Sequence, residues 1–258
     1  MASQPIYQFY AELCDYKPKM WRRFQVANNI TMAKLGYILM TIFEMKASHL
    51  FCFDVPFEEN FKKEMTKKFS EKDLIRALEG TSYLSPINNN WHIEILTEES
   101  YEYRDNENEK LMDAVETTVK NVLNYPDDYM TFRYDYGDNW QVTVVLDKII
   151  VDKKLPGKEL PRVLEGEGFG IIEDCGGTSG LEDIAKTFKK KKGKQYEEYC
   201  DWLGCVDLDL LEFDIDDMNF RLKKIPRIFA DAYELGLEPT KRSLDLLERK
   251  YRRTTEQI

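Results

Sequence analysis

The chain has 258 residues, of which 43% are hydrophobic and 13% aromatic, enough apolar material for a well-filled core of one or two domains. With 47 acidic against 37 basic residues, it has a formal net charge of -10 at pH 7. This excess of negative charge argues against a protein that binds nucleic acid through its overall charge, so we expect no nucleic-acid partner.

The first 55 residues have the pattern of a hairpin followed by a helix and a third strand. Apolar and polar residues alternate over 6–14 and 21–26, and Pro18 lies in the turn between these strands. A helix is predicted over 31–45, where apolar residues recur at helical spacing, and a strand over 49–55. This order predicts a β-grasp-like mixed sheet with a helix packed on one face.

The middle of the chain continues this α+β pattern. Residues 57–80 have a helical pattern and are predicted to form an insertion on the core. A short strand is predicted over 91–96 and an amphipathic helix over 109–124. Two further strands, over 129–136 and 140–150, are joined by the tight-turn sequence Gly-Asp-Asn. We expect all these strands to share one sheet with the N-terminal hairpin.

The last third of the chain combines an irregular segment with short helices. Residues 153–180 are rich in glycine and proline and are predicted to be irregular. Helices are predicted over 195–203, 216–224, 228–235 and 240–253. We therefore expect an α+β core domain over 1–225 and a C-terminal helical extension over 226–258. Trp21 and Trp140 should be largely buried in the core.

Cysteine usage and the N-terminal segment predict where the protein works. The five cysteines are scattered and form no C-x-x-C pair, which is typical of a reducing compartment. The N-terminal segment lacks the basic and apolar regions of a signal peptide, and no stretch approaches 18 consecutive apolar residues. We therefore expect a cytoplasmic protein without a membrane partner.

The most distinctive blocks of the sequence are FRYDYGDNW at 132–140 and EDCGG at 173–177. They are accompanied by PKMWRR at 18–23, the helix start at 31–35, and the segments 49–53, 161–166 and 202–204. In this combination the chain resembles the plasmid pRiA ORF-three-like family, also described as insertion-element passengers of the TnpR type. The resemblance implies an α+β fold and an origin in mobile elements, without an established reaction.

The chain departs from this family at three positions. Members typically carry histidines where this sequence has Gly36, Phe51 and Val142. The resemblance therefore implies that metal or acid–base chemistry through those histidines is lost here, which favours a binding role. Resolvase chemistry is rejected, because Ser3 is the only early serine and only two arginines follow it closely.

Four carboxylates in the two distinctive blocks are the candidate catalytic residues. Asp135 and Asp138 flank Tyr-Gly in the first block, whereas Glu173 and Asp174 precede Gly-Gly in the second. If the two loops meet, these side chains could hold Mg²⁺ or Mn²⁺ for phosphoryl chemistry, with Asp138, Glu173 and Asp174 as the candidate metal ligands. Turn formation and the capping of backbone amides explain the same residues without a metal. We therefore expect no cofactor and keep a metal-dependent hydrolase or nuclease as the alternative.

Two further side chains near these blocks are expected to be structural. Cys175 lies among carboxylates, which should raise its pKa and make it a poor nucleophile. His49 is expected to be a hydrogen-bonded histidine of the core or its rim rather than a catalytic one.

The C-terminal helix carries the candidate partner-binding residues. Leu244, Leu247 and Tyr251 recur at i, i+3 and i+7 and form an apolar stripe that should pack against a partner or against its own core. We therefore expect a mobile-element accessory protein that binds another protein, such as a host or defence component. A homodimer formed through this stripe stays open.

Overall fold

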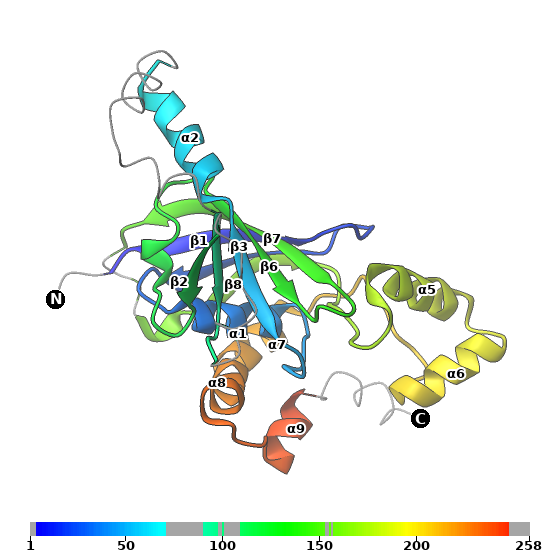
Figure 1. Ribbon diagram of the computed structural model, residues 1–258. Helices are drawn as coiled ribbons and strands as arrows, with labels where there is room; N and C mark the ends of the chain where they lie inside the picture. The colour runs from blue at the N-terminus through cyan, green and yellow to red at the C-terminus, as the bar shows by residue number, and fades with distance from the viewer. Residues whose placement is uncertain are drawn as a thin grey trace.

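The computed structural model describes residues 4–70, 90–97, 100, 109–152, 155 and 157–247. In these residues the fold is α+β, as the sequence predicted, and is built on an eight-stranded mixed sheet in the order β5-β4-β3-β6-β7-β1-β2-β8 (Figure 1). Neighbouring strands are antiparallel except for β4 and β5, which are parallel. The strands are β1 (Ile6–Leu13), β2 (Trp21–Ala27), β3 (Phe51–Val55), β4 (Asn90–Glu94), β5 (Glu109–Asp113), β6 (Tyr129–Tyr134), β7 (Trp140–Ile150) and β8 (Arg162–Glu167).

Helices lie against the sheet and project from both of its ends. Helices α7 and α8 pack against α1 on the same side of the sheet, whereas α2 projects from one end and α5 and α6 from the other (Figure 1). The helices of the described residues are α1 (Met32–Ile42), α2 (Phe57–Lys68), α5 (Gly177–Lys190), α6 (Lys194–Leu203), α7 (Ile215–Leu222), α8 (Ile225–Leu235) and α9 (Lys241–Leu247).

Helix α1 is the centre of the apolar core. Thr31 caps its N-terminus, where the side-chain oxygen accepts a hydrogen bond from the backbone N–H of Lys34 at 3.2 Å. Ten of its eleven residues are buried, because the sheet lies on one side and α7 and α8 on the other. The facing strands alternate as a sheet with one buried face must, and in β7 every second residue from Trp140 to Leu146 is buried.

A buried guanidinium ties the edge of this sheet to α1. Arg22 in β2 is fully buried, and its five N–H groups donate to five backbone carbonyls at 2.6–3.0 Å. The accepting residues are Trp21, Ile42, Glu167, Gly168 and Phe169. The ring of Phe213 lies 3.9 Å from the guanidinium carbon. Burial lowers the pKa of Arg22 to about 9, while Glu44 acts in the opposite direction.

Replacing Arg22 by lysine should destabilise the protein by about 3–5 kcal/mol. The lysine ammonium has three N–H donors on a single nitrogen, and these cannot reach all five carbonyls that the planar guanidinium satisfies. Urea denaturation of both proteins measures the difference. The matched control is Arg23→Lys, since Arg23 is only half-buried and pairs with Asp147 and Glu165 at the surface; it should change the stability by about 1 kcal/mol or less. Equal losses in the two variants would contradict the role given to Arg22.

The prediction of a helix over 109–124 is wrong. Residues Glu109–Asp113 form strand β5, which pairs in parallel with β4, and a single 3-10 turn follows at Val119–Asn121. The apolar residues of this segment fit a helical period, but the first five residues of the segment pair with the edge of β4 as a strand. Tertiary pairing has overridden the local pattern here.

Two other expectations also need correction. The segment 153–180 is not wholly irregular, because β8 lies within it and pairs with β2, and α5 begins at Gly177. Trp140 is fully buried as predicted, but Trp21 is only half-buried. Alternation along β2 turns Arg22 toward the core and therefore places Trp21 on the opposite face, where it stacks on Tyr10 at 5.5 Å.

The finer parts of the predicted architecture have different outcomes. The β-grasp-like description of the sheet is not confirmed, and β1 pairs with β7 in antiparallel orientation. Of the predicted insertion 57–80, α2 is present and residues 71–80 lie outside the described residues. The division into 1–225 and 226–258 stays a prediction. Among the described helices, none has the length and apolar character needed to cross a membrane.

Candidate functional site

The two distinctive sequence blocks meet in space. The turn between β6 and β7 contacts the loop before α5, where the backbone N–H of Gly176 donates to Asp138 Oδ2 at 3.2 Å. Gly177 has a φ of +70°, and a Cβ there would lie 2.6 Å from the backbone oxygen of Asp138. Only glycine allows so close an approach, so this residue sets the spacing of the two loops.

Asp135 uses its two carboxylate oxygens differently. Oδ1 accepts hydrogen bonds from the backbone N–H groups of Gly137 at 3.0 Å and Asp138 at 3.3 Å, which is the turn role expected from the sequence. Oδ2 instead lies 3.4 Å from His49 Nε2. The hydrogen bonds of Oδ1 within the turn therefore hold Oδ2 in position beside His49.

His49, Asp135 and Asp174 form a cluster that could bind a metal ion. His49 Nε2 lies 3.5 Å from Asp174 Oδ1, and the three candidate ligand atoms are all within 4.8 Å of one another. Ligands about 2.1 Å from a tetrahedral metal are about 3.4 Å apart, so the two measured distances fit such a centre. Within the described part of the chain, Nε2 is buried and makes no hydrogen bond. The cluster is open to solvent on the side of Asp174, whose side chain is 73% exposed.

Glu173 is not a member of this cluster. It is 5% exposed and accepts hydrogen bonds from the Lys46 backbone at 2.6 Å, from Ser48 Oγ at 2.5 Å and from Tyr134 Oη at 2.5 Å. Burial and the charge of Glu173 raise the pKa of Tyr134, which keeps the phenol protonated as a donor. Glu173 thus anchors the segment that carries His49.

The four predicted carboxylates therefore separate into three roles. Asp135 and Asp174 converge on a histidine, Asp138 caps the glycine loop, and Glu173 is a buried anchor. Burial, followed by the charges of Asp138 and Asp174, raises the pKa of the Cys175 thiol to about 12, in line with the expectation that it is a poor nucleophile.

His49 was expected to be a hydrogen-bonded histidine of the core or its rim, but its buried Nε2 makes no hydrogen bond in the described residues. It lies between α1 and β3 and reaches the two aspartates only because Glu173 and Tyr134 fix the preceding segment. No spacing along the chain indicates this contact, since the three residues are 86 and 39 positions apart. The pairing depends on how the loops pack.

The three positions at which the family resemblance implied histidines lie in the apolar interior. A Cβ on Gly36 would lie 2.5 Å from the Phe51 ring, so the ring takes up the space above the glycine. Phe51 also packs against Phe132 and Tyr233 with ring centroids 5.7 Å and 5.3 Å away, and Val142 is fully buried. In this chain these positions serve packing.

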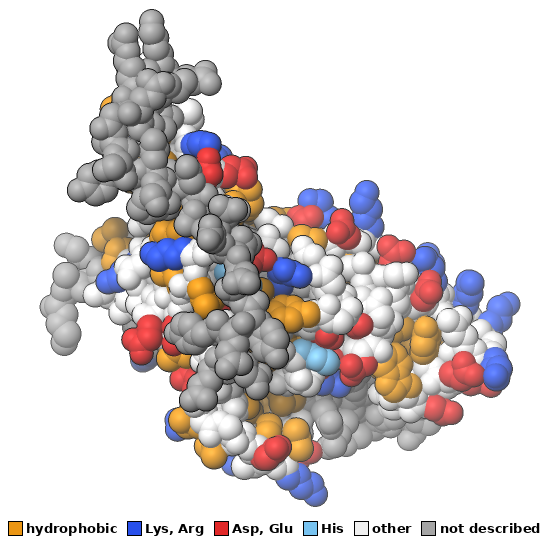
Figure 2. All heavy atoms as spheres, in the orientation of Figure 1, with side chains coloured by type: hydrophobic (Ala, Val, Ile, Leu, Met, Phe, Trp, Pro, Cys, Tyr) orange, Lys and Arg blue, Asp and Glu red, His pale blue; other side chains and the backbone are white. Residues whose placement is uncertain are grey.

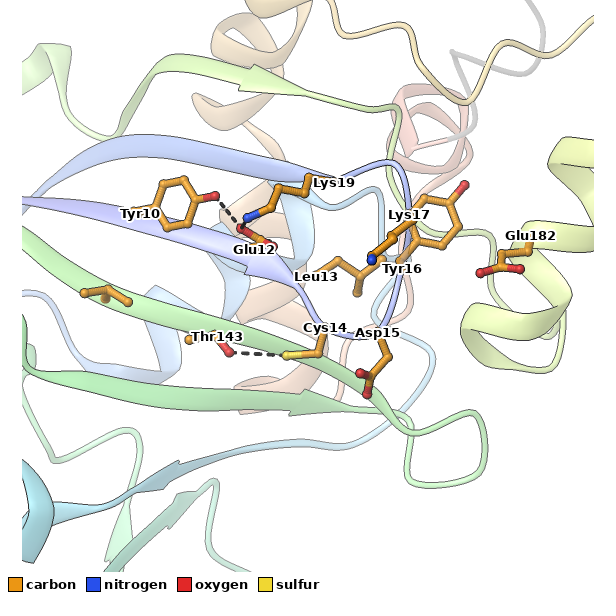
Figure 3. A pocket seen from close by; sticks show the side chains of 11 residues that line it. Tyr10, Glu12, Leu13, Cys14, Asp15, Tyr16, Lys17, Lys19, Thr143 and Glu182 are labelled. Carbon is orange, nitrogen blue, oxygen red and sulfur yellow. Dashed lines mark hydrogen bonds and ion pairs between the residues drawn. The ribbon is translucent and has the colours of Figure 1, made fainter.

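A second feature is a groove around the turn between β1 and β2. Figure 3 shows its smaller part, of about 590 Å³, where Tyr16 and Lys17 of the turn lie across from Glu182 of α5. The larger part, of about 880 Å³, shares these three residues and continues between α5 and the loop 207–211. The two parts together form one surface, which we call the turn groove.

The predicted partner stripe is only partly described. Leu247 is 8% exposed and lines a small cavity together with Phe229 and other residues of α8, so α9 packs on its own chain through this residue. Leu244 is 44% exposed, and Tyr251 lies outside the described residues. The interface role of the stripe stays a prediction.

Replacing Glu173 by glutamine should destabilise the protein by about 1–3 kcal/mol, because a buried amide cannot accept from all three donors. Chemical denaturation followed by tryptophan fluorescence measures the loss. Glu182→Gln on the surface of α5 is the control and should stay within about 0.5 kcal/mol of the wild type. A Glu173→Gln protein as stable as this control would contradict the anchoring role.

Comparison with known proteins agrees with the resemblance seen in the sequence. The family model for plasmid pRiA4b ORF-3-like proteins matches residues 5–221. A crystal structure of a protein of unknown function from Methanosarcina mazei Go1 has a TM-score of 0.61 and 23% sequence identity, and the match covers 83% of this chain and 97% of that one. At this identity the likeness shows the fold alone. No curated protein matches the chain.

Proposed function

The chain belongs to the plasmid pRiA4b ORF-3-like family, and on that premise we propose that it is a mobile-element accessory protein that binds a segment of another protein in the turn groove. The observation that carries the proposal is the composition of this groove. Its larger part combines an apolar floor with four lysines, which outnumber the three carboxylates Glu182, Asp207 and Asp209 there, on a chain whose net charge is negative.

The floor of the groove is apolar. Phe188 of α5 and Leu210 of the facing loop are almost fully buried and lie at the bottom. Leu211 is 62% exposed at the edge, where a partner side chain would cover it. Exposed apolar side chains of this size next to a groove are typical of protein interaction sites.

The rim favours an acidic partner. Lys186 and Lys191 pair with Glu182 and Asp207, whereas no carboxylate of the described residues pairs with Lys17 or Lys189. Figure 2 shows basic side chains interspersed with acidic ones at the end of the molecule formed by α5 and α6. The occupant that fits is a peptide segment with two or three apolar anchors flanked by Asp or Glu.

Peptide display against the full chain tests this proposal. Selection should enrich apolar peptides flanked by acidic residues, and fluorescence anisotropy should show affinity that falls as salt rises. Leu211→Asp should weaken binding about tenfold or more, because it places a charge against the anchors. The control, Leu235→Asp, changes an equally exposed leucine of α8 and should leave affinity unchanged.

Two outcomes would refute the groove as the site. One is a selected peptide that binds wild type and Leu211→Asp equally well. The other is a wild-type homodimer, seen by sedimentation, that becomes monomeric in Leu211→Asp, because a second copy would then be the occupant.

A second candidate function is metal-dependent hydrolysis at His49, Asp135 and Asp174. The ligand separations near 3.4 Å and the buried Nε2 without a hydrogen bond favour it. A divalent cation held there would supply an activated water for attack on a phosphate or ester. The three side chains would hold the cation, and the exposed side of Asp174 would admit the substrate.

Titration with Mn²⁺ should raise the melting temperature if this cluster binds metal, since a ligand at 100 times its Kd stabilises the folded state by about 2.7 kcal/mol. Asp174→Asn should abolish the rise. Asp135→Asn should do so as well while retaining the turn, because an amide oxygen can still accept from Gly137. Asp138→Asn is the control and should keep the rise, since its carboxylate faces Gly176. A rise that persists in Asp174→Asn would exclude this site.

A further inference from the structure

A second group of ligand-type side chains lies on the other face of the sheet. Phe51 and Phe53 of β3 point toward α1 and the core, so alternation places Cys52 and Asp54 on the opposite face. In the register of β3 and β4, Asp54 lies opposite His92 and Cys52 opposite Glu94. Two adjacent strands thus present a two-by-two array of a thiol, two carboxylates and an imidazole.

Distances within the array show that its members converge. His92 Nδ1 lies 2.7 Å from Asp54 Oδ1, and His92 Nε2 lies 3.2 Å from Glu94 Oε2. Ligand atoms of Cys52, Asp54 and His92 are all within 4.8 Å of one another. Cys52 is fully buried and the His92 side chain is 8% exposed, so protein atoms hold both in place.

Each carboxylate has a separate task in this arrangement. Asp54 Oδ2 faces Arg133 Nη1 at 3.5 Å, which leaves Oδ1 to face the histidine. Glu94 lies next to the other ring nitrogen, Nε2, and can accept a hydrogen bond from the proton on Nε2. A histidine that ligates a metal through one nitrogen almost always donates from the other to a carboxylate or carbonyl, and Glu94 supplies that partner.

We propose that Cys52, Asp54 and His92 form a Zn²⁺ site, with the imidazole coordinating through Nδ1 and Glu94 positioning the ring through Nε2. Sulfur, nitrogen and carboxylate oxygen are the ligand types of protein-bound zinc, and a thiolate disfavours Mg²⁺ and Mn²⁺. Three protein ligands leave one tetrahedral position for water. Binding displaces the thiol proton and the proton between Nδ1 and Oδ1, and these two atoms, now at a hydrogen-bond distance of 2.7 Å, must move apart to about 3.4 Å.

This site is independent of the cluster around His49. It shares no residue with that cluster, and its thiol gives it a different metal preference and a different spectroscopic signature. The two proposals can therefore fail separately.

Cobalt substitution of the full-length, chelator-treated protein tests the proposal. One equivalent of Co²⁺ should produce visible d–d bands of a tetrahedral centre and a near-ultraviolet thiolate charge-transfer band, and Zn²⁺ should remove both. Cys52→Ser should abolish the charge-transfer band. Glu94→Gln should retain it but weaken Zn²⁺ binding about 10–100-fold in competition with a chromogenic chelator.

Matched controls separate this site from other thiols and histidines. Cys14→Ser changes a half-buried thiol bonded to Thr143, and His49→Gln changes the other cluster, which has no thiol; both should leave the thiolate charge-transfer band unchanged. Absence of a charge-transfer band in the wild type would overturn the proposal, as would a band that persists in Cys52→Ser. If Cys52→Ser does not fold, Asp54→Asn takes its place, and undiminished Zn²⁺ affinity in that variant would also overturn it.

Discussion

The burial of one guanidinium constrains much of this fold. Arg22 can lie in the interior only because five carbonyls from β2, from the end of α1, from the end of β8 and from the segment after β8 all accept from it. Each of these segments must therefore keep its position, since an unpaired carbonyl or a displaced cation in the interior would cost several kcal/mol. The segment held after β8 leads directly into the loop that carries Glu173 and Asp174, so the order imposed at Arg22 extends to the candidate site.

The candidate functional features lie at the ends of helices and strands. The cluster of His49, Asp135 and Asp174 is assembled from three connections, each fixed by hydrogen bonds to a neighbour, and the turn groove lies between a hairpin turn and a helix. The interior between them is apolar and aromatic, including the positions at which the family resemblance implied histidines. The candidate ligand side chains therefore lie at the rim of the core and on the polar face of the sheet.

Sequence patterns predicted the fold class and most elements because alternation and helical spacing are local properties. The pattern predicted β6, β7 and the turn between them from turn chemistry, and α1 from its cap and spacing. It failed at residues 109–113, where a free strand edge outweighed helical periodicity, and at Trp21, where the charged Arg22 took the inward position. It indicated the carboxylates but not His49, because no rule of spacing connects residues brought together only by loop packing.

The register of β3 gives the aromatic interior a role in aligning the polar face. Sliding this strand by one residue against β4 and β6 would transfer each of its side chains to the other face. Phe51 and Phe53 would then be exposed to polar surroundings at a cost of about 1.5–3 kcal/mol each, while Asp54 would enter the apolar interior. The two phenylalanines thus fix the register of the opposite face, because they determine which side chain of β3 lies opposite His92.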